Sequence, residues 1–301
     1  MPKKIEIIEV GPRDGLQNEN QILAHSKRST LVKKLSNTGL KRIEVGAFVS
    51  PHRVPQMEDS IKVARTCLKF AKNKNLKLQY SALVPNMRGL QDFLKTDLKE
   101  AALFAACTES FSQKNINCSI EESFIRFKDV ATECRKNKIK LRGYLSTVFG
   151  CPFEGDVSPK QVVKVAHKML EVGVYEISLG DTIGVASPKQ VKQVIKALLD
   201  SGVPAKRIAG HYHDTRGTAL ANVIASIDLG ITKFDSSVGG LGGCPYAPGA
   251  AGNLASEDLV YCLHKMGITT GVDLKALIEV ARWLQKEIGH PISSHLAMTP
   301  S

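Results

Sequence analysis

The chain has 301 residues, of which 43% are hydrophobic, and it carries a formal net charge of +12 at pH 7. This length fits either two ordinary domains or one α/β barrel. No apolar run approaches the roughly eighteen residues of a membrane span, and the first residues pass from two lysines directly into a strand-like segment. We therefore expect no membrane span and no signal or transit peptide.

The excess of basic residues is dispersed over stretches with helical spacing, without an arginine-rich tail or an interleaved aromatic platform. This distribution predicts a solvated basic surface and no nucleic-acid partner, and it is compatible with an anionic small molecule. The seven cysteines are irregularly spaced and form no CxxC pair. A disulfide framework and a cysteine-rich zinc site are therefore not expected, and we predict a reducing, cytoplasmic setting.

Eight short runs rich in β-branched residues follow one another along the chain, and each is typical of a buried strand. They cover residues 5–11, 41–48, 77–84, 101–107, 140–150, 175–181, 207–214 and 233–240. Between them, apolar residues recur with helical spacing, for example over residues 162–170 and 191–198. Strand and helix thus alternate eight times without a linker, in units of the size of a βα repeat.

This alternation predicts an α/β fold, a TIM (β/α)8 barrel in one catalytic domain over residues 1–301. A dinucleotide-binding open sheet is the alternative, but no GxGxxG motif follows the first strand. Additional C-terminal helices are expected as an extension over about residues 253–290. Asp273 is the predicted N-cap of the last one, and Gly267 and Gly289 are predicted helix ends.

In a TIM barrel the loops that follow the strands converge into one cleft, so catalytic residues are expected there. The predicted strand ends are polar: Arg13, Asp14, Glu44, Asp181, His211, His213 and the loop around Cys244. These side chains should therefore face one another.

The motif "HYHD" places His211 and His213 two residues apart on a strand, so both imidazoles point to the same face. Strand one lies beside strand eight in a closed barrel, which brings Asp14 toward both histidines. Asn253 could add an amide oxygen, and the resulting oxygen and nitrogen ligands suit Mg²⁺ or Mn²⁺. Core histidines, and a helix N-cap role for Asn253, are the alternatives.

Six stretches together resemble the 3-hydroxy-3-methylglutaryl-CoA lyases, which belong to the DRE-TIM metallolyases: "EVGPRDGLQNE", "IEVGAFVSP", "NINCSIEESF", "YEISLGDTIGV", "HYHDTRGTALAN" and "GLGGCPYAPGAAGNLASEDLVY". The resemblance implies divalent-metal-dependent cleavage of an acyl-CoA to acetyl-CoA and acetoacetate. It also implies Asp14, His211, His213 and Asn253 as the metal ligands. The chain departs from the family pattern at Gly46 and Ala47, where the lyases tend to carry hydroxyl residues.

The cleavage needs a group that holds the enolate oxygen, a base and a proton donor. Arg13 beside Asp14 is the predicted enolate holder, and a structural ion pair with Glu44 is the alternative. Asp181 and His211 are both candidate bases for the hydroxyl proton. Cys244, in a loop dense in glycine, is the predicted proton donor, with a buried free thiol as the alternative.

Further residues are expected to support the site or bind substrate: Gln17, Glu44, Glu257, Asn115 and Ser119. Glu257 follows Asn253 by four residues, on what we expect to be one helical face. Glu44 is expected to orient Arg13. The stretch "QKNINCSIEESF" is expected to begin a helix whose free N–H groups meet the CoA phosphates, through the region of Asn115 and Ser119.

Other functions remain open at this point. A lyase for another branched 3-hydroxyacyl-CoA fits the departures from the family pattern, and a Claisen-type synthase shares the Arg-Asp turn and the HxH motif. Leu16 and the cysteine loop disfavour the synthase. A non-enzymatic basic binding protein is a third class, disfavoured by the metal-ligand set. The partners expected are an acyl-CoA and a second copy of the chain, in a dimer.

Overall fold

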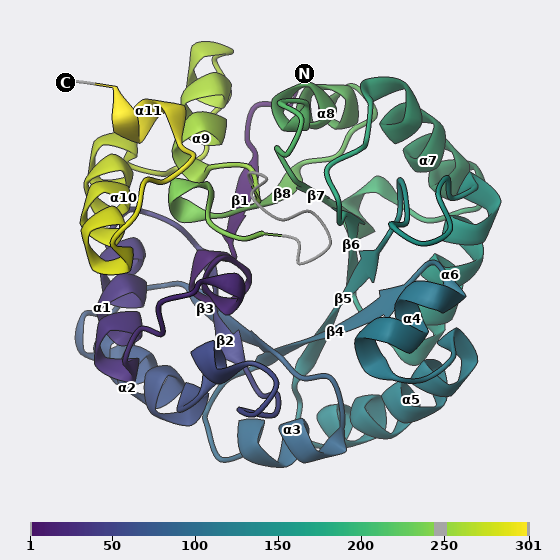
Figure 1. Ribbon diagram of the computed structural model, residues 1–301, viewed down its shortest axis with the longest axis horizontal. Coiled ribbons are helices and arrows are strands. Elements are labelled where there is room, and N and C mark those ends of the chain that lie inside the picture. Colours follow the sequence, from purple (N-terminus) through teal and green to yellow (C-terminus); the bar gives the residue numbers. More distant parts are fainter. Residues whose placement is uncertain (1, 244–251, 300–301) are drawn as a thin grey trace.

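The computed structural model describes residues 2–243 and 252–299. Eight parallel strands form a closed barrel in sequence order, with β1 paired to β8 (Figure 1). The strands are β1 (Glu6–Glu9), β2 (Arg42–Ala47), β3 (Gln79–Leu83), β4 (Glu100–Ala106), β5 (Lys140–Ser146), β6 (Glu176–Asp181), β7 (Ile208–Tyr212) and β8 (Lys233–Ser236). The TIM barrel predicted from the sequence is confirmed: seven of the eight predicted runs contain one strand each, and β4 begins one residue before the remaining run, at Glu100.

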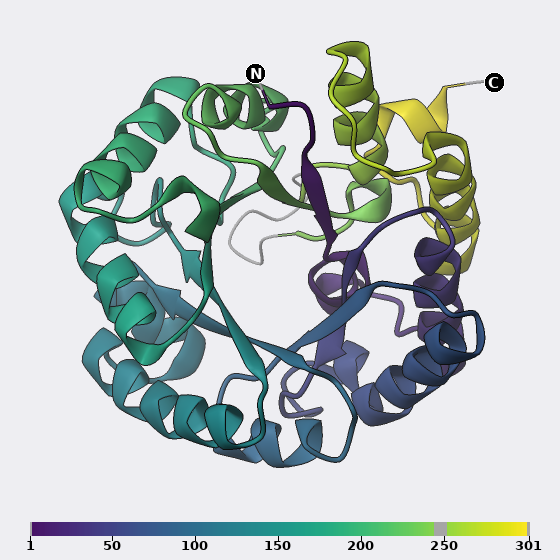
Figure 2. The same cartoon turned by 180° about the vertical axis from the view of Figure 1, so that it is seen from behind.

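Helices ring the barrel on its outside, as the two opposite views show (Figure 1 and Figure 2). They are α1 (His25–Ser36), α2 (Ser60–Asn73), α3 (Met87–Phe93), α4 (Glu109–Ile116), α5 (Ile120–Lys136), α6 (Pro159–Val172), α7 (Pro188–Asp200), α8 (Ala219–Ile227), α9 (Ser256–Lys265), α10 (Leu274–Ile288) and α11 (His295–Met298). The apolar faces of these helices share one buried core with the strands, except that of α4, whose Phe111 lies in a smaller cluster with Ala106 and Cys151. In the described part of the chain, no helix is long and apolar enough to cross a membrane.

The expected C-terminal helices are α9 and α10, and the short α11 follows them. The side chain of Asp273 accepts the N–H of Ala276 at 3.1 Å, which confirms the predicted N-cap of α10. Gly289 ends α10 in the left-handed region at φ 75°, and Gly267 follows α9 at φ 73°. α10 packs beside α1, so the C-terminal helices close the outer layer next to the first strand (Figure 1).

Candidate active site

The carboxyl ends of β1, β8 and β7 bring three potential metal ligands together. Asp14 lies in the helical turn Gly11–Gly15, which directly follows β1. His211 is on β7, and His213 follows that strand by one residue. One ligand atom from each of the three side chains lies within 4.8 Å of the other two. Parallel pairing of β1 with β8 and of β8 with β7 explains how residues so distant in sequence meet.

The electrostatics of this cluster favour an ionised carboxylate at Asp14 and a neutral imidazole at His213. Burial opposes ionisation of Asp14, but the attraction of Arg13, His211 and His213 outweighs it and lowers the pKa of Asp14 to about 2. Burial and the neighbouring His211 lower the pKa of His213 to about 4. Nδ1 of His213 is buried and has no hydrogen-bond partner among the described residues. A neutral imidazole nitrogen without a protein partner fits a metal ligand.

Asn253 lies against the same cluster. The backbone of Asn253 forms an isolated antiparallel bridge with His213. The side-chain amide donates to Asp14 Oδ2 at 2.8 Å and to the carbonyl of Leu241 at 3.1 Å. Rotation of the amide by half a turn would present its oxygen to the cluster instead. The alternative role as a helix N-cap is wrong, because α9 begins at Ser256 and Ala255 precedes it.

Arg13 lies beside the cluster between two carboxylates. Its Nε donates to Glu44 Oε2 at 2.6 Å and its Nη1 donates to Asp14. The guanidinium also stacks over the ring of Tyr144 at 5.1 Å, and the Tyr144 hydroxyl donates to Glu44 at 3.1 Å. The ion pair with Glu44 is therefore formed, and it holds the guanidinium next to Asp14. Gln17 completes this side by donating to Asp14 Oδ1 at 3.0 Å.

Asp181 ends β6 and has a different set of partners. Its carboxylate accepts the backbone N–H groups of Val185 and Ala186, at 2.9 and 3.2 Å. Burial raises the pKa of Asp181 to about 6, against the lowering effect of those two donors. Asp181 is outside the cluster of Asp14, His211 and His213. The carboxyl thus shapes the loop after β6, and its pKa suits proton transfer near neutral pH.

Two expectations about helices near the site need correction. Glu257 does not share a helical face with Asn253, because Asn253 precedes α9. The stretch around Asn115 also does not begin the helix after β4, because it lies at the end of α4, where Asn115 is exposed. Ser119 caps the next helix, α5, in a capping box with Glu122. Neither Asn115 nor Ser119 lies in the metal-ligand cluster.

Gly242 and Gly252, which flank the glycine-rich segment around Cys244, are in close backbone contact. Gly242 has φ 112°, which only glycine adopts easily, and a Cβ there would meet the amide of Asn253. A Cβ at Gly252 would overlap the backbone of Gly242. These two glycines therefore let the ends of the segment touch. Cys244, the predicted proton donor, lies outside the described residues.

The turn Val238–Gly240, which leads into this segment, is held by buried carboxyls. Glu9 accepts the N–H of Val238 at 2.9 Å, and Glu257 accepts the N–H of Gly239 at 3.1 Å. Burial raises the pKa of Glu9 to about 7 and that of Glu257 to about 8. The carbonyl of Gly239 also accepts the N–H of Ser293 at 3.0 Å. Glu257 therefore holds this turn in place.

Sequence reasoning did not single out three buried residues near the cluster: Arg142, Tyr144 and Asp235. Asp235 accepts a hydrogen bond from Nδ1 of His211 at 3.2 Å, and Arg142 pairs with Asp235 at 2.8 Å. A signal was present, because polar residues alternate at a period of two inside otherwise apolar predicted strands. In a barrel, that alternation indicates side chains that point to the interior.

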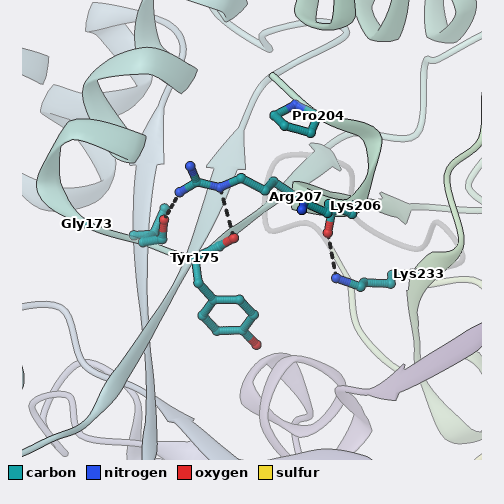
Figure 3. Close-up of a pocket in the computed structure, with 7 residues that line it drawn as sticks. Gly173, Tyr175, Pro204, Lys206, Arg207 and Lys233 are labelled. Atoms are coloured by element: carbon teal, nitrogen blue, oxygen red, sulfur yellow. Dashed lines mark hydrogen bonds between the residues drawn. The ribbon is translucent and has the colours of Figure 1, made fainter. Parts of the chain in front are cut away.

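A hollow of about 770 Å³ lies away from this cluster, at residues that lead into the strands (Figure 3). Two of its basic side chains, those of Arg207 and Lys233, already have partners. Arg207 donates to the carbonyls of Val174 and Tyr175, and Lys233 donates to the carbonyl of Lys206 at 2.7 Å (Figure 3). Active sites of TIM barrels occur at the opposite end. The cluster around Asp14 is therefore the candidate active site.

The fold and this cluster define a TIM-barrel protein with a candidate divalent-metal centre at the carboxyl ends of its strands. Residues 4–284 match the HMGL-like family. The 3-hydroxy-3-isohexenylglutaryl-CoA/hydroxy-methylglutaryl-CoA lyase of Pseudomonas aeruginosa is 49% identical, over 99% of this chain and 97% of its own length.

Solved structures of HMG-CoA lyases are similar to this chain over almost its whole length. The crystal structure of the HMG-CoA lyase of Bacillus subtilis is 47% identical, with a TM-score of 0.94 over 98% of this chain and 97% of its own. An Acinetobacter baumannii HMG-CoA lyase, solved with coenzyme A and 3-methylmalate, is 36% identical, with a TM-score of 0.91 over 98% and 94%. The chain belongs to the HMGL-like family.

Proposed function

We propose that this protein is a divalent-metal-dependent hydroxymethylglutaryl-CoA lyase, which cleaves 3-hydroxy-3-methylglutaryl-CoA to acetyl-CoA and acetoacetate. The observation that carries the proposal is the cluster of Asp14, His211 and His213, with Arg13 fixed beside it. The named activity of relatives that match almost the whole chain supports the same reaction.

The residues fit Mg²⁺ or Mn²⁺. Asp14 supplies an ionised carboxylate, and His211 and His213 supply imidazoles, one of which has a buried nitrogen without a partner in the described residues. Asn253 would add its amide oxygen after rotation of the amide. When bound, such an ion lowers the pKa of the substrate hydroxyl and orients it. A site with few protein ligands and a partly polar setting suits Mg²⁺ or Mn²⁺ better than it suits a structural zinc ion, which protein ligands enclose completely.

Arg13 then has the role of holding the enolate oxygen of acetyl-CoA as carbon–carbon cleavage proceeds. Its ion pairs with Glu44 and Asp14 fix the guanidinium before substrate arrives, so little reorganisation is needed. Cys244 has the role of returning a proton to the enolate carbon, which yields the methyl group of acetyl-CoA.

The base has two candidates, and the hydrogen bonds of His211 favour Asp181. Nδ1 of His211 is engaged by Asp235, and Nε2 lies 3.7 Å from Asp14. If His211 binds the ion through Nε2, neither ring nitrogen is available for the substrate proton. Asp181, with a pKa of about 6, then takes the hydroxyl proton.

The experiment is a panel of 3-hydroxyacyl-CoA thioesters, incubated with purified protein and Mg²⁺ and assayed for acetyl-CoA release. We expect release from 3-hydroxy-3-methylglutaryl-CoA and its loss on chelation. The panel includes 3-hydroxy-3-isohexenylglutaryl-CoA, because that substrate is in the name of a relative that is 49% identical. Release only from the longer thioester would favour the second substrate, and release from neither would overturn the proposal.

We further propose a dimer in a reducing cytoplasm, with one catalytic domain. The cysteines that the structure describes are unpaired, which fits a reducing compartment. The barrel and the C-terminal helices share one hydrophobic core, which fits one domain. Size-exclusion chromatography with light scattering tests the dimer, and a single monomeric peak would contradict it.

A further inference from the structure

Asp235 is a fully buried carboxylate next to a proposed metal ligand. Its Oδ2 accepts from Ser178 Oγ at 2.6 Å, from Arg142 Nη1 at 3.2 Å and from His211 Nδ1 at 3.2 Å. Its Oδ1 accepts from Arg142 Nη2 at 2.8 Å. The carboxylate is thus held by three side chains, and His211 is the one that reaches the candidate active site.

Strand register explains why these side chains meet. His211 on β7 pairs with Asp235 on β8, so their side chains are direct neighbours inside the barrel. Arg142 on β5 reaches Asp235 from across the interior, with a side chain that is 2% exposed. The two strands that carry Arg142 and Asp235 are not adjacent. Their contact is therefore a bridge through the barrel, which depends on closure of the sheet.

The chemistry of the contact determines the state of His211. A carboxylate that accepts a two-point ion pair from Arg142 and a hydroxyl hydrogen bond from Ser178 is an acceptor. Nδ1 of His211, at 3.2 Å, must then be the donor, because two acceptors facing each other repel. The other nitrogen, Nε2, lies 3.7 Å from Asp14 Oδ2, which is beyond hydrogen-bonding distance, so no donor is required there and its lone pair stays available to an ion.

We infer that Asp235, fixed by Arg142 and Ser178, is a positioning residue that holds His211 as its Nδ1–H tautomer and keeps Nε2 turned toward the metal site. This inference rests on the proposed function only in taking His211 as a metal ligand. A carboxylate behind a ligating histidine fixes the orientation of the ring and increases its basicity as a ligand.

Arg142 is itself held in place from the opposite side. Its Nε donates to Glu176 at 2.8 Å, and its guanidinium stacks on the ring of Tyr144 at 4.9 Å. The same Tyr144 ring packs edge-on against His211, with 6.0 Å between ring centroids. A shift of Asp235 would therefore displace Arg142 and the side chains packed against it. This packing keeps the carboxylate in a fixed place, as a positioning residue requires.

The first test is made on the wild-type protein, and a substitution serves only to assign the signals. Two-bond ¹H–¹⁵N NMR of metal-free wild-type protein distinguishes the two imidazole tautomers, and the His211 signals are identified by their loss in His211→Gln. We expect Nδ1 of His211 to carry the proton whenever the ring is neutral. A predominant Nε2–H tautomer would overturn the inference.

The second test measures Mn²⁺ affinity by electron paramagnetic resonance. Asp235→Asn should weaken binding by roughly 10- to 100-fold, the range for partners behind a metal ligand. Ser178→Ala keeps the ion pair with Arg142 and should weaken binding less. If Asp235→Asn does not fold, Ser178→Ala still tests the inference. Unchanged Mn²⁺ affinity in folded Asp235→Asn or in Ser178→Ala would contradict the inference.

Glu100→Gln is the matched control. Glu100 is also a buried carboxyl inside the barrel, and it pairs with Arg42 at 3.2 Å and with the Tyr175 hydroxyl at 2.8 Å, without contact to His211. It should lower stability but leave Mn²⁺ affinity and the His211 tautomer unchanged. Wild-type protein that binds no Mn²⁺ would refute the proposed function, whereas normal binding with an unaffected Asp235→Asn would refute only the positioning role.

Discussion

Arg13→Lys separates the electrostatic role of Arg13 from its charge. In the wild type, Nε of Arg13 donates to Glu44 at 2.6 Å while Nη1 donates to Asp14, and the side chain is 6% exposed. A lysine ammonium is a point charge without this planar fork, so it cannot serve both carboxylates in the same geometry. Glu44, whose Oε1 already has no partner among the described residues, would then lose the guanidinium N–H that donates to its Oε2.

The cost follows from these contacts. Removing one partner of a buried ion pair costs about 3–5 kcal/mol. Here the charge is kept and the Tyr144 hydroxyl still donates to Glu44, so we expect about 2 kcal/mol of lost unfolding free energy. At about 2.1 cal/mol/K of unfolding entropy per residue, this loss lowers the Tm of 301 residues by about 3 °C. If Arg13 holds the enolate oxygen, kcat should fall by about 100-fold with a smaller change in KM.

The assay is steady-state acetyl-CoA release at saturating Mg²⁺, with thermal unfolding of the same preparations. Arg207→Lys is the matched control, because Arg207 lies at the opposite end of the barrel and donates only to backbone carbonyls in the contacts described. It should leave kcat unchanged. A higher KM with an unchanged kcat in Arg13→Lys would show that Arg13 binds substrate, and would refute the enolate role.

Replacing His211 or His213 with alanine should abolish tight Mn²⁺ binding and leave a folded barrel by circular dichroism, and full activity with excess chelator would contradict the metal site. Cys244→Ser should keep acyl-CoA binding but lose roughly 10²- to 10⁴-fold in kcat, whereas an acyl group trapped on Cys244 would argue for a nucleophile. Burial raises the pKa of Glu257 from 4.5 to about 8, so the native state binds more protons than the unfolded state between about pH 4.5 and 8, and stability falls as pH rises across this window and levels off above it. Glu257→Gln should make the urea midpoint of unfolding less dependent on pH, and the same pH dependence in the variant and the wild type would contradict this prediction.

The barrel was predictable because each of its units is defined locally. The run of residues 101–107, for example, is wholly apolar, and β4 is buried along almost all of its length. Asp273 and Gly289 follow equally local rules of helix capping. The pairing of Asp14 with the HxH motif was predictable for a different reason, since a closed barrel necessarily places strand one beside strand eight.

The remaining parts of the site depend on geometry that no local pattern contains. Asn253 looked like a helix start, but the chain stays extended until Ala255 because it bridges to β7. Asp235 stood in a predicted strand without a visible partner, since Arg142 contacts it from across the barrel interior. Asn115 was placed in a helix start that the structure assigns to Ser119, because two helices follow β4 where one was expected.

Closure of the sheet between β1 and β8 has a consequence for folding. Asp14 belongs to the start of the chain, while His211 and Asn253 come from its last third, so the ligand set is incomplete until the whole barrel has formed. Such long-range contacts form late and slowly. A nascent or partly folded chain should therefore have no high-affinity ion site, and the native state alone would gain stability from added Mn²⁺. Ion affinity followed during refolding would then report the moment at which the two ends of the chain join.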